Sequence, residues 1–135
     1  MIGFNSWCLL KESFEDFPEG PRRRYAIQAS MLSRHDKNIT INDEDGKVVG
    51  IASVWKEPDV SNDEGIPDGM YIKIRNMAVK EKGLGERLFE KIKKYAKSHN
   101  AGILLNTTEG AEDFYIKLGM HRGTGANYYL TSDEI

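Results

Sequence analysis

The sequence lacks the features that would place it in a membrane or in an oxidising compartment. It has a single cysteine, Cys8, in 135 residues, so no internal disulfide can form and a reducing compartment is favoured. No apolar run approaches the ~20 residues that a membrane-spanning helix needs. The N-terminal stretch has no basic start and carries acids early, unlike a signal peptide. We therefore expect a cytoplasmic protein without membrane association.

The chain also lacks an excess of charge of either sign. Nineteen basic and 21 acidic residues give a net charge of -2, which argues against a general nucleic-acid binder because such proteins neutralise many phosphates. Hydrophobic residues make up 39% and charged residues 30%, an ordinary globular balance. The length predicts one domain over residues 1–135, as a monomer or a homodimer. No metal site is predicted.

One local basic patch stands out against this balance, in the segment "RRRY" at Arg22–Tyr25. Pro21 is well placed in a first helical turn, and the pattern predicts a helix that carries Tyr25, Ala29 and Leu32 on one face. The arginines can be the solvated side of that helix. Alternatively they can bind an acidic substrate or a cofactor phosphate.

The next segment reads as a β-hairpin followed by a loop. Ile39 and Ile41 alternate with polar residues, "DEDG" forms the turn, and Val48–Trp55 is the return strand. The polar segment Lys56–Gly69 is predicted as a long loop, and loops of this length are often functional. A further strand is predicted over Met70–Val79.

The remaining chain alternates helices and strands. An amphipathic helix follows two glycines, with one apolar stripe formed by Leu84, Leu88, Phe89, Ile92 and Tyr95. Then come a short buried strand "GILLN", a short helix that Gly119 ends, and a final strand "ANYYLTS". The order is helix, three strands, helix, strand, helix, strand, which predicts an α/β fold: a mixed, mostly antiparallel sheet with helices packed on it.

Gly83 and Gly85 stand where the strand ends and the amphipathic helix begins. A helix N-terminus presents free N–H groups and a partial positive charge, and glycines allow an anion to approach them closely. The spacing excludes a P-loop, and a dinucleotide fingerprint would need a third glycine where Leu88 stands. A pyrophosphate would suit such a turn, although for an isolated Gly-x-Gly a tight turn without a ligand is the better explanation.

Two motifs together give the chain a resemblance to a known family. "NMAVKEKGLGERLFEKI" and then "TTEGAEDFYIKLGM" resemble the GCN5-related N-acetyltransferases, the GNAT superfamily. Members of that family are similar in having a strand that ends Ala-Val, a Gly-x-Gly turn into a helix, and a short helix reading A-x-x-F-Y-x-K-x-G. The resemblance covers residues 48 to 135. It implies the GNAT acyl-CoA N-acyltransferase fold and transfer of an acetyl group from acetyl-CoA to the amine of a small molecule or peptide.

The resemblance also implies the cofactor-binding and catalytic residues. In similar proteins the turn amides hold the pyrophosphate of coenzyme A, and the preceding strand binds the pantetheine arm through its backbone. The tyrosine of the second motif, Tyr115, would protonate the leaving thiolate; alternatively its ring only packs on its helix. The residues expected at the cofactor are Met77, Ala78, Val79, Lys80, Lys82, Gly83, Leu84, Gly85, Glu86 and Thr108.

The chain departs from the family pattern at three positions. Only "KEK" separates Val79 from Gly83, whereas family members usually carry a longer stretch with an Arg or Gln, whose place Lys80 takes. Thr108 stands where many relatives have Asn. Lys73 stands where some members carry a glutamate base and cannot serve as a carboxylate. Removing the proton from an amine of pKa ~10.4 at pH 7 costs about 4.6 kcal/mol, so a base is worth identifying.

The base, the acceptor and the class of protein stay open at this stage. Proton loss through water is compatible with the pattern, as are the following titratable residues: Glu64, Asp68, His35, His99 and His121. The acids of the predicted loop favour a cationic acceptor or simply keep that loop solvated. A non-catalytic module that senses coenzyme A or docks a partner is the alternative, and an unrelated α+β interaction domain is the third reading.

Overall fold

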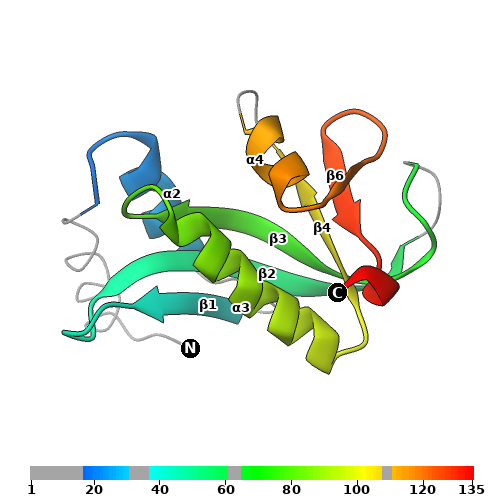
Figure 1. Cartoon of the computed structure of the whole chain (residues 1–135), viewed down its shortest axis with the longest axis horizontal. Helices are drawn as coiled ribbons and strands as arrows, with labels where there is room; N and C mark the ends of the chain where they lie inside the picture. Colours follow the sequence, from blue (N-terminus) through cyan, green and yellow to red (C-terminus); the bar gives the residue numbers. More distant parts are fainter. Residues whose placement is uncertain (1–16, 31–36, 61–64, 108–110) are drawn as a thin grey trace. The chain divides into compact units, whose positions relative to one another are not determined.

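The computed structural model describes residues 17–30, 37–60, 65–107 and 111–135 (Figure 1). No helix in these ranges is long and apolar enough to cross a membrane. Several residues singled out above lie outside the described ranges: Cys8, Leu32, His35, Glu64 and Thr108. The elements are α2 (Pro21–Ser30), β1 (Lys37–Asn42), β2 (Val48–Val60), β3 (Gly69–Val79), α3 (Leu84–Ser98), β4 (Gly102–Asn106), α4 (Glu112–Lys117), β5 (His121–Arg122), β6 (Asn127–Leu130) and the 3-10 helix η2 (Ser132–Glu134).

The strands form one six-stranded mixed sheet in the order β1-β2-β3-β4-β6-β5. β1 is antiparallel to β2, and β6 is antiparallel to both β4 and β5. β3 and β4 are parallel. The expected α/β fold with a mixed sheet and flanking helices is confirmed. The chain divides into two compact units, one made of Met1–Val54 with Arg75–Lys91 and the other of Trp55–Ile74 with Ile92–Ile135.

The first unit is held together by a core between α2 and the sheet. Ala26 and Ala29 of α2 are fully buried and cluster with Ile51 of β2 and Ala78 of β3. The small alanine side chains let the helix backbone approach the strands closely, and Tyr25 closes the edge of this cluster. The predicted helical face that carries Tyr25 and Ala29 is therefore confirmed.

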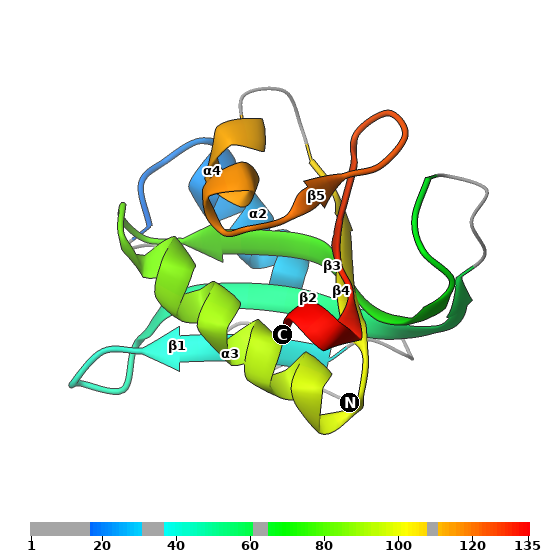
Figure 2. The same cartoon turned by 45° about the vertical axis from the view of Figure 1, so that its right-hand side comes forward.

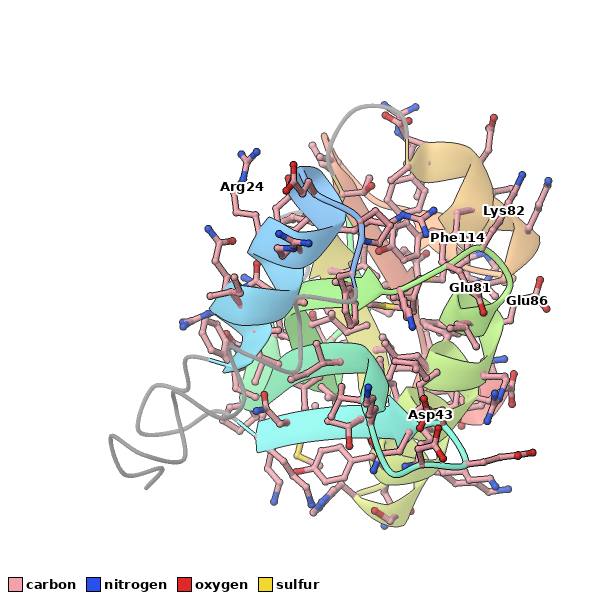
Figure 3. All side chains as sticks on the ribbon, turned by 90° about the vertical axis from the view of Figure 1, so that its left-hand side faces the viewer. Arg24, Asp43, Glu81, Lys82, Glu86 and Phe114 are labelled. Atoms are coloured by element: carbon pink, nitrogen blue, oxygen red, sulfur yellow. The ribbon has the colours of Figure 1, made fainter. Side chains whose placement is uncertain are left out.

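The predicted hairpin turn also lies in the first unit. The carboxylate of Asp43, labelled in Figure 3, accepts hydrogen bonds from the amides of Asp45 and Lys47, each at 2.9 Å. Gly46 adopts φ +81°, a left-handed conformation that glycine reaches without steric cost. The local sequence "DEDG" thus fixes the register in which β1 meets β2.

The second unit has its own core at the start of β3. Tyr71 packs with Ile66 and Leu104, and its hydroxyl donates a 2.7 Å hydrogen bond to the carbonyl of Pro67. The short helix α4 also lies in the second unit. It ends at Lys117, and Gly119 follows with φ +89°. The predicted glycine at the end of this helix is confirmed.

Gly102 at the start of β4 leaves no room for a side chain. A Cβ there would lie 2.3 Å from the carbonyl oxygen of Leu130 and 2.8 Å from the ring of Tyr71. The oxygen belongs to the backbone of the neighbouring strand and cannot move without disturbing the β4–β6 ladder. We expect Gly102→Ala to lower the free energy of unfolding by about 1–3 kcal/mol in urea denaturation. Gly46→Asn, at a turn with open space around it, is the control and should change it far less.

The segment predicted as a loop after Trp55 is partly strand, which corrects the sequence interpretation. β2 continues through Val60 rather than ending at Trp55. The loop was predicted from the polar composition of this segment. Pro58 lacks an N–H, but among the described residues β1 pairs with β2 only as far as Val54. Proline is tolerated on an edge where no ladder hydrogen bond is needed.

Two further elements were missed because they are too short for any periodicity. Figure 2 shows β5 leading through a loop into β6, with which it pairs as an antiparallel hairpin. η2 follows β6 and is capped by Thr131, whose backbone and hydroxyl both donate hydrogen bonds to Glu134. The other predicted strands are confirmed within two residues, and α3 begins at Leu84 as expected. The first predicted helix is confirmed over Pro21–Ser30 and the short one over Glu112–Lys117, while their predicted extensions fall partly outside the described residues.

Candidate cofactor and active site

The end of β3 offers a strand edge to an extended ligand. The β3–β4 ladder pairs residues 71–74 of β3 with residues 102–105 of β4 and stops there. β3 itself continues to Val79, so within the described ranges its last residues have no ladder with β4. This edge carries Met77, Ala78 and Val79, the residues expected at the pantetheine arm. Backbone groups on such an edge can hydrogen-bond an amide-containing chain.

The turn after β3 is hydrogen-bonded to β2 at its first residue and is uncrowded around Gly83. The amide of Lys80 donates to the carbonyl of Val49 at 2.8 Å, and the amide of Leu84 donates to that of Glu81 at 3.4 Å. Gly83 adopts φ +96°, which L side chains rarely adopt, and a Cβ there would meet no atom within 4 Å. The backbone conformation therefore favours glycine at this position, and no atom crowds the place where a side chain would begin.

The amides around Gly83 are suited to an anion. Lys82 and Gly83 precede α3, and Gly85 and Glu86 lie in its first turn, where no carbonyl of the helix can accept their hydrogen bonds. The helix dipole adds partial positive charge at the same place. Free amides and a helix dipole at one place suit an anionic group such as a pyrophosphate.

The side chains at this turn partly oppose an anion. Figure 3 shows Glu81, Lys82 and Glu86 on the turn and on the start of α3. Glu81 and Glu86 are both exposed, and they compete with an incoming phosphate for the same positive potential. Another cation reaches the turn from α2, because Nη1 of Arg22 donates a hydrogen bond to the carbonyl of Lys80 at 3.3 Å.

Tyr115 lies on α4, in the second unit. Its ring packs edge-on against Phe114, with 5.1 Å between centroids, and lies 6.4 Å from the ring of Tyr128. Burial raises the pKa of the Tyr115 hydroxyl above its ordinary value of 10.0. The hydroxyl therefore stays protonated at neutral pH and is available as a proton donor.

The structure reveals a carboxylate that sequence reasoning missed. Glu57, in the part of β2 that the sequence predicts as a loop, is half-buried and accepts a 2.7 Å hydrogen bond from the indole Nε1 of Trp55. The ammonium of Lys73 lies 5.5 Å from the centroid of the same indole ring. The available signal was the alternation that continues from Trp55, the last residue of the predicted strand, to Glu57.

The base candidates named from the sequence lie in different settings. Asp68 is exposed, and His99 packs edge-on against Tyr95 at the end of α3. His121 contacts the carboxylate of Glu134; hydrogen bonds from His121 and Thr131 lower the pKa of Glu134 to about 2. Among the described residues, no group of three or more His, Cys, Asp or Glu is placed to hold a metal ion.

The chain belongs to the acetyltransferase (GNAT) family, whose model matches residues 6–120. That match spans both the glycine turn and the helix of Tyr115. Comparison with curated protein sequences gave no match. The family expected from the two motifs is therefore confirmed.

Solved structures share the fold at low sequence identity. Tetrahymena GCN5 is 18% identical with a TM-score of 0.62, covering 96% of this chain and 88% of that one. The Bacillus subtilis N-acetyltransferase YlbP in complex with coenzyme A is 16% identical with a TM-score of 0.62, covering 98% and 93%. A KacTA–DNA complex is 11% identical with a TM-score of 0.66, covering 82% and 76%. At these identities the likeness concerns the fold alone.

Proposed function

We propose that this protein is an N-acetyltransferase that moves the acetyl group of acetyl-CoA to a primary amine by direct transfer in a ternary complex. The observation that carries the proposal is the end of β3 in the first unit. There the β3–β4 ladder has ended, and the strand runs into a glycine turn in which a Cβ on Gly83 would meet no atom within 4 Å. Membership of the GNAT family and the coenzyme A bound in the Bacillus subtilis relative support this assignment.

The chain's own residues would supply binding, orientation and proton transfer. Met77, Ala78 and Val79 would hold the pantetheine arm through backbone hydrogen bonds, and the amides of residues 82–86 would hold the pyrophosphate. The cofactor supplies an activated thioester. Holding that thioester beside the amine contributes several kcal/mol through positioning alone. Tyr115 would protonate the departing sulfur, and Thr108, outside the described ranges, remains proposed at the cofactor.

Two paired measurements test the proposal. Isothermal calorimetry with acetyl-CoA and with CoA measures binding, and release of free thiol in the presence of spermidine, lysine and a lysine-containing peptide measures transfer. We expect saturable binding of both ligands and thiol release that depends on an amine. Absence of binding at millimolar coenzyme A would contradict the proposal and favour an interaction domain of unrelated activity.

A non-catalytic coenzyme A sensor of the same fold is the second candidate. The shortened "KEK" turn and the lysine at position 73 favour it, because both depart from the catalytic pattern of the family. Binding of acetyl-CoA without amine-dependent thiol release, across the whole amine panel, would select this candidate.

We also propose that Glu57, in the second unit, receives the proton of the incoming amine. Its carboxylate is fixed by the Trp55 indole, and the ammonium of Lys73 beside the same ring indicates that a cation is accommodated there. Glu57→Gln keeps a side-chain oxygen for the Trp55 hydrogen bond but removes the base. We expect its kcat/KM to fall by about 10²-fold at pH 7, the lower range for losing a general base.

The pH dependence separates a base from a merely structural role. Primary amines deprotonate near pH 10.4, so the need for a base shrinks as the pH rises. The gap between the Glu57→Gln variant and the wild type should therefore narrow between pH 7 and pH 9.5. A deficit that is equal at both values would show that Glu57 acts through structure. Glu90→Gln, an exposed change on α3, is the control.

The cellular setting follows from the same proposal. We propose one functional domain over residues 1–135, working in the cytoplasm as a monomer or a homodimer. The net charge of -2 gives no support to general nucleic-acid binding. The acids of the segment Lys56–Gly69 support a cationic small molecule or peptide as the proposed acceptor.

A further inference from the structure

The three arginines of α2 have three different environments in the first unit. Arg23 is committed to the chain that leads into its own helix: its guanidinium donates to the carbonyl of Phe17 at 3.0 and 3.1 Å and lies 3.7 Å from the carboxylate of Glu19. Arg24 is exposed, and Figure 3 shows it on the side of α2 turned away from the turn of Lys82. Arg22 contacts the glycine turn, through a hydrogen bond from its Nη1 to the carbonyl of Lys80.

The position of Arg22 is fixed by how α2 packs. Residues four and seven positions apart lie on the same helical stripe, and Arg22 shares that stripe with Ala26 and Ala29. Both alanines are fully buried against the core that includes Ala78, two residues before the turn. The stripe that docks the helix therefore carries Arg22 to the end of β3.

The point that Arg22 reaches is itself held in place. Its Nη1 donates to the carbonyl of Lys80, and the amide of Lys80 donates to Val49 of β2. This single bond uses one of the five N–H groups of a guanidinium. The side chain remains exposed, so its other donors are open to a ligand.

The charges of the turn explain why a further cation is useful there. Lys80 and Lys82 are offset by Glu81 and Glu86, so the turn by itself brings no net positive charge. The pyrophosphate of coenzyme A carries two negative charges. Family members usually place an arginine or glutamine at the position that Lys80 takes here, and an ammonium cannot supply the bidentate geometry of a guanidinium.

We propose that Arg22 is a phosphate-binding residue of the cofactor site, contacting the pyrophosphate of coenzyme A from α2. The inference rests on the proposed function, since it needs a coenzyme A site at the turn. Lys80 lies between the pantetheine-binding edge of β3 and the turn amides. A guanidinium at its carbonyl is therefore beside the pyrophosphate rather than at the adenosine end.

Calorimetry of Arg22→Gln with three ligands tests this assignment at 50 mM salt. CoA carries the pyrophosphate and the 3′-phosphate, dephospho-CoA carries only the pyrophosphate, and pantetheine carries neither. We expect the Kd for CoA and for dephospho-CoA to rise by about tenfold each, with pantetheine unchanged, and the loss to shrink at 0.5 M salt because the side chain is exposed. Arg22→Lys should recover part of the loss, and Arg24→Gln is the matched control with no effect.

Each other outcome overturns the inference in a distinct way. Loss with CoA but not with dephospho-CoA would place Arg22 at the 3′-phosphate. An equal loss with pantetheine would mean that Arg22 only holds the Lys80 carbonyl in place. Unchanged affinity for all three ligands would leave no ligand role. If the wild-type protein itself fails to bind CoA, the proposed function fails together with this site, whereas a failure confined to the Arg22 variants leaves the proposed function intact.

Discussion

Gly83→Asp is expected to abolish coenzyme A binding while the chain stays folded. The new carboxylate would project into the open space in front of the turn, where the pyrophosphate has to approach the amides. Hydrogen bonds to charged groups contribute about 1.5–3 kcal/mol each, so losing two of them raises Kd by roughly 100-fold or more. Calorimetry with CoA measures the affinity, and urea denaturation verifies the fold.

Gly83→Asn is the matched control for this variant. Asparagine has the shape of aspartate without its charge, and both residues pay the same backbone strain at φ +96°. We expect the Gly83→Asn variant to bind CoA more tightly than the Gly83→Asp variant. The two variants should have the same free energy of unfolding. Equal affinities would show that shape rather than charge closes the turn, and wild-type affinity in both would remove the phosphate site. Gly85 is a poorer target because it is buried in the first turn of α3.

The cofactor half of the site could be predicted because its signals are local. A strand that ends Ala-Val, a left-handed glycine and an amphipathic helix are consecutive in the sequence, and each has one physical cause. Gly83 has the required positive φ, and Leu88, Phe89 and Ile92 form the buried stripe that was expected of α3. The family motif then assigned a ligand to a turn that geometry alone left open.

The parts that escaped prediction depend on contacts between segments far apart in the chain. The polar composition of the segment around Glu57 predicts a loop, and the continuation of β2 through Val60 depends on pairing between strands that the local sequence does not encode. The contact of Arg22 with the Lys80 carbonyl joins residues 58 positions apart, and no periodicity encodes it. β5 has two residues and exists only because β6 pairs with it.

Tyr115→Phe is expected to lower turnover by about 10²-fold, the usual scale for losing one general acid, with the Kd for CoA within about threefold of wild type. Phenylalanine keeps the ring that packs against Phe114 and Tyr128, so the unfolding free energy should change little. Steady-state thiol release with the amine that gives the highest wild-type turnover, beside calorimetry with CoA, provides both numbers. Tyr115→Ala would lose stability as well, because the half-buried ring that packs against Phe114 and Tyr128 is missing.

Two dependences identify the Tyr115 hydroxyl as the proton donor rather than a packing group. The first is the leaving group: the deficit of the Phe variant should shrink for thioesters whose thiol has a lower pKa, since a better leaving group needs less protonation. The second is pH. Burial raises the pKa of Tyr115 above 10.0, so its proton is retained at neutral pH and lost only as the pH rises through that higher value. The wild-type rate should therefore decline above pH 10 towards the rate of the Phe variant, which has no hydroxyl to ionise. A Phe variant that turns over at the wild-type rate would show that the departing thiolate takes its proton from water or from another donor. Tyr115 would then serve only in packing.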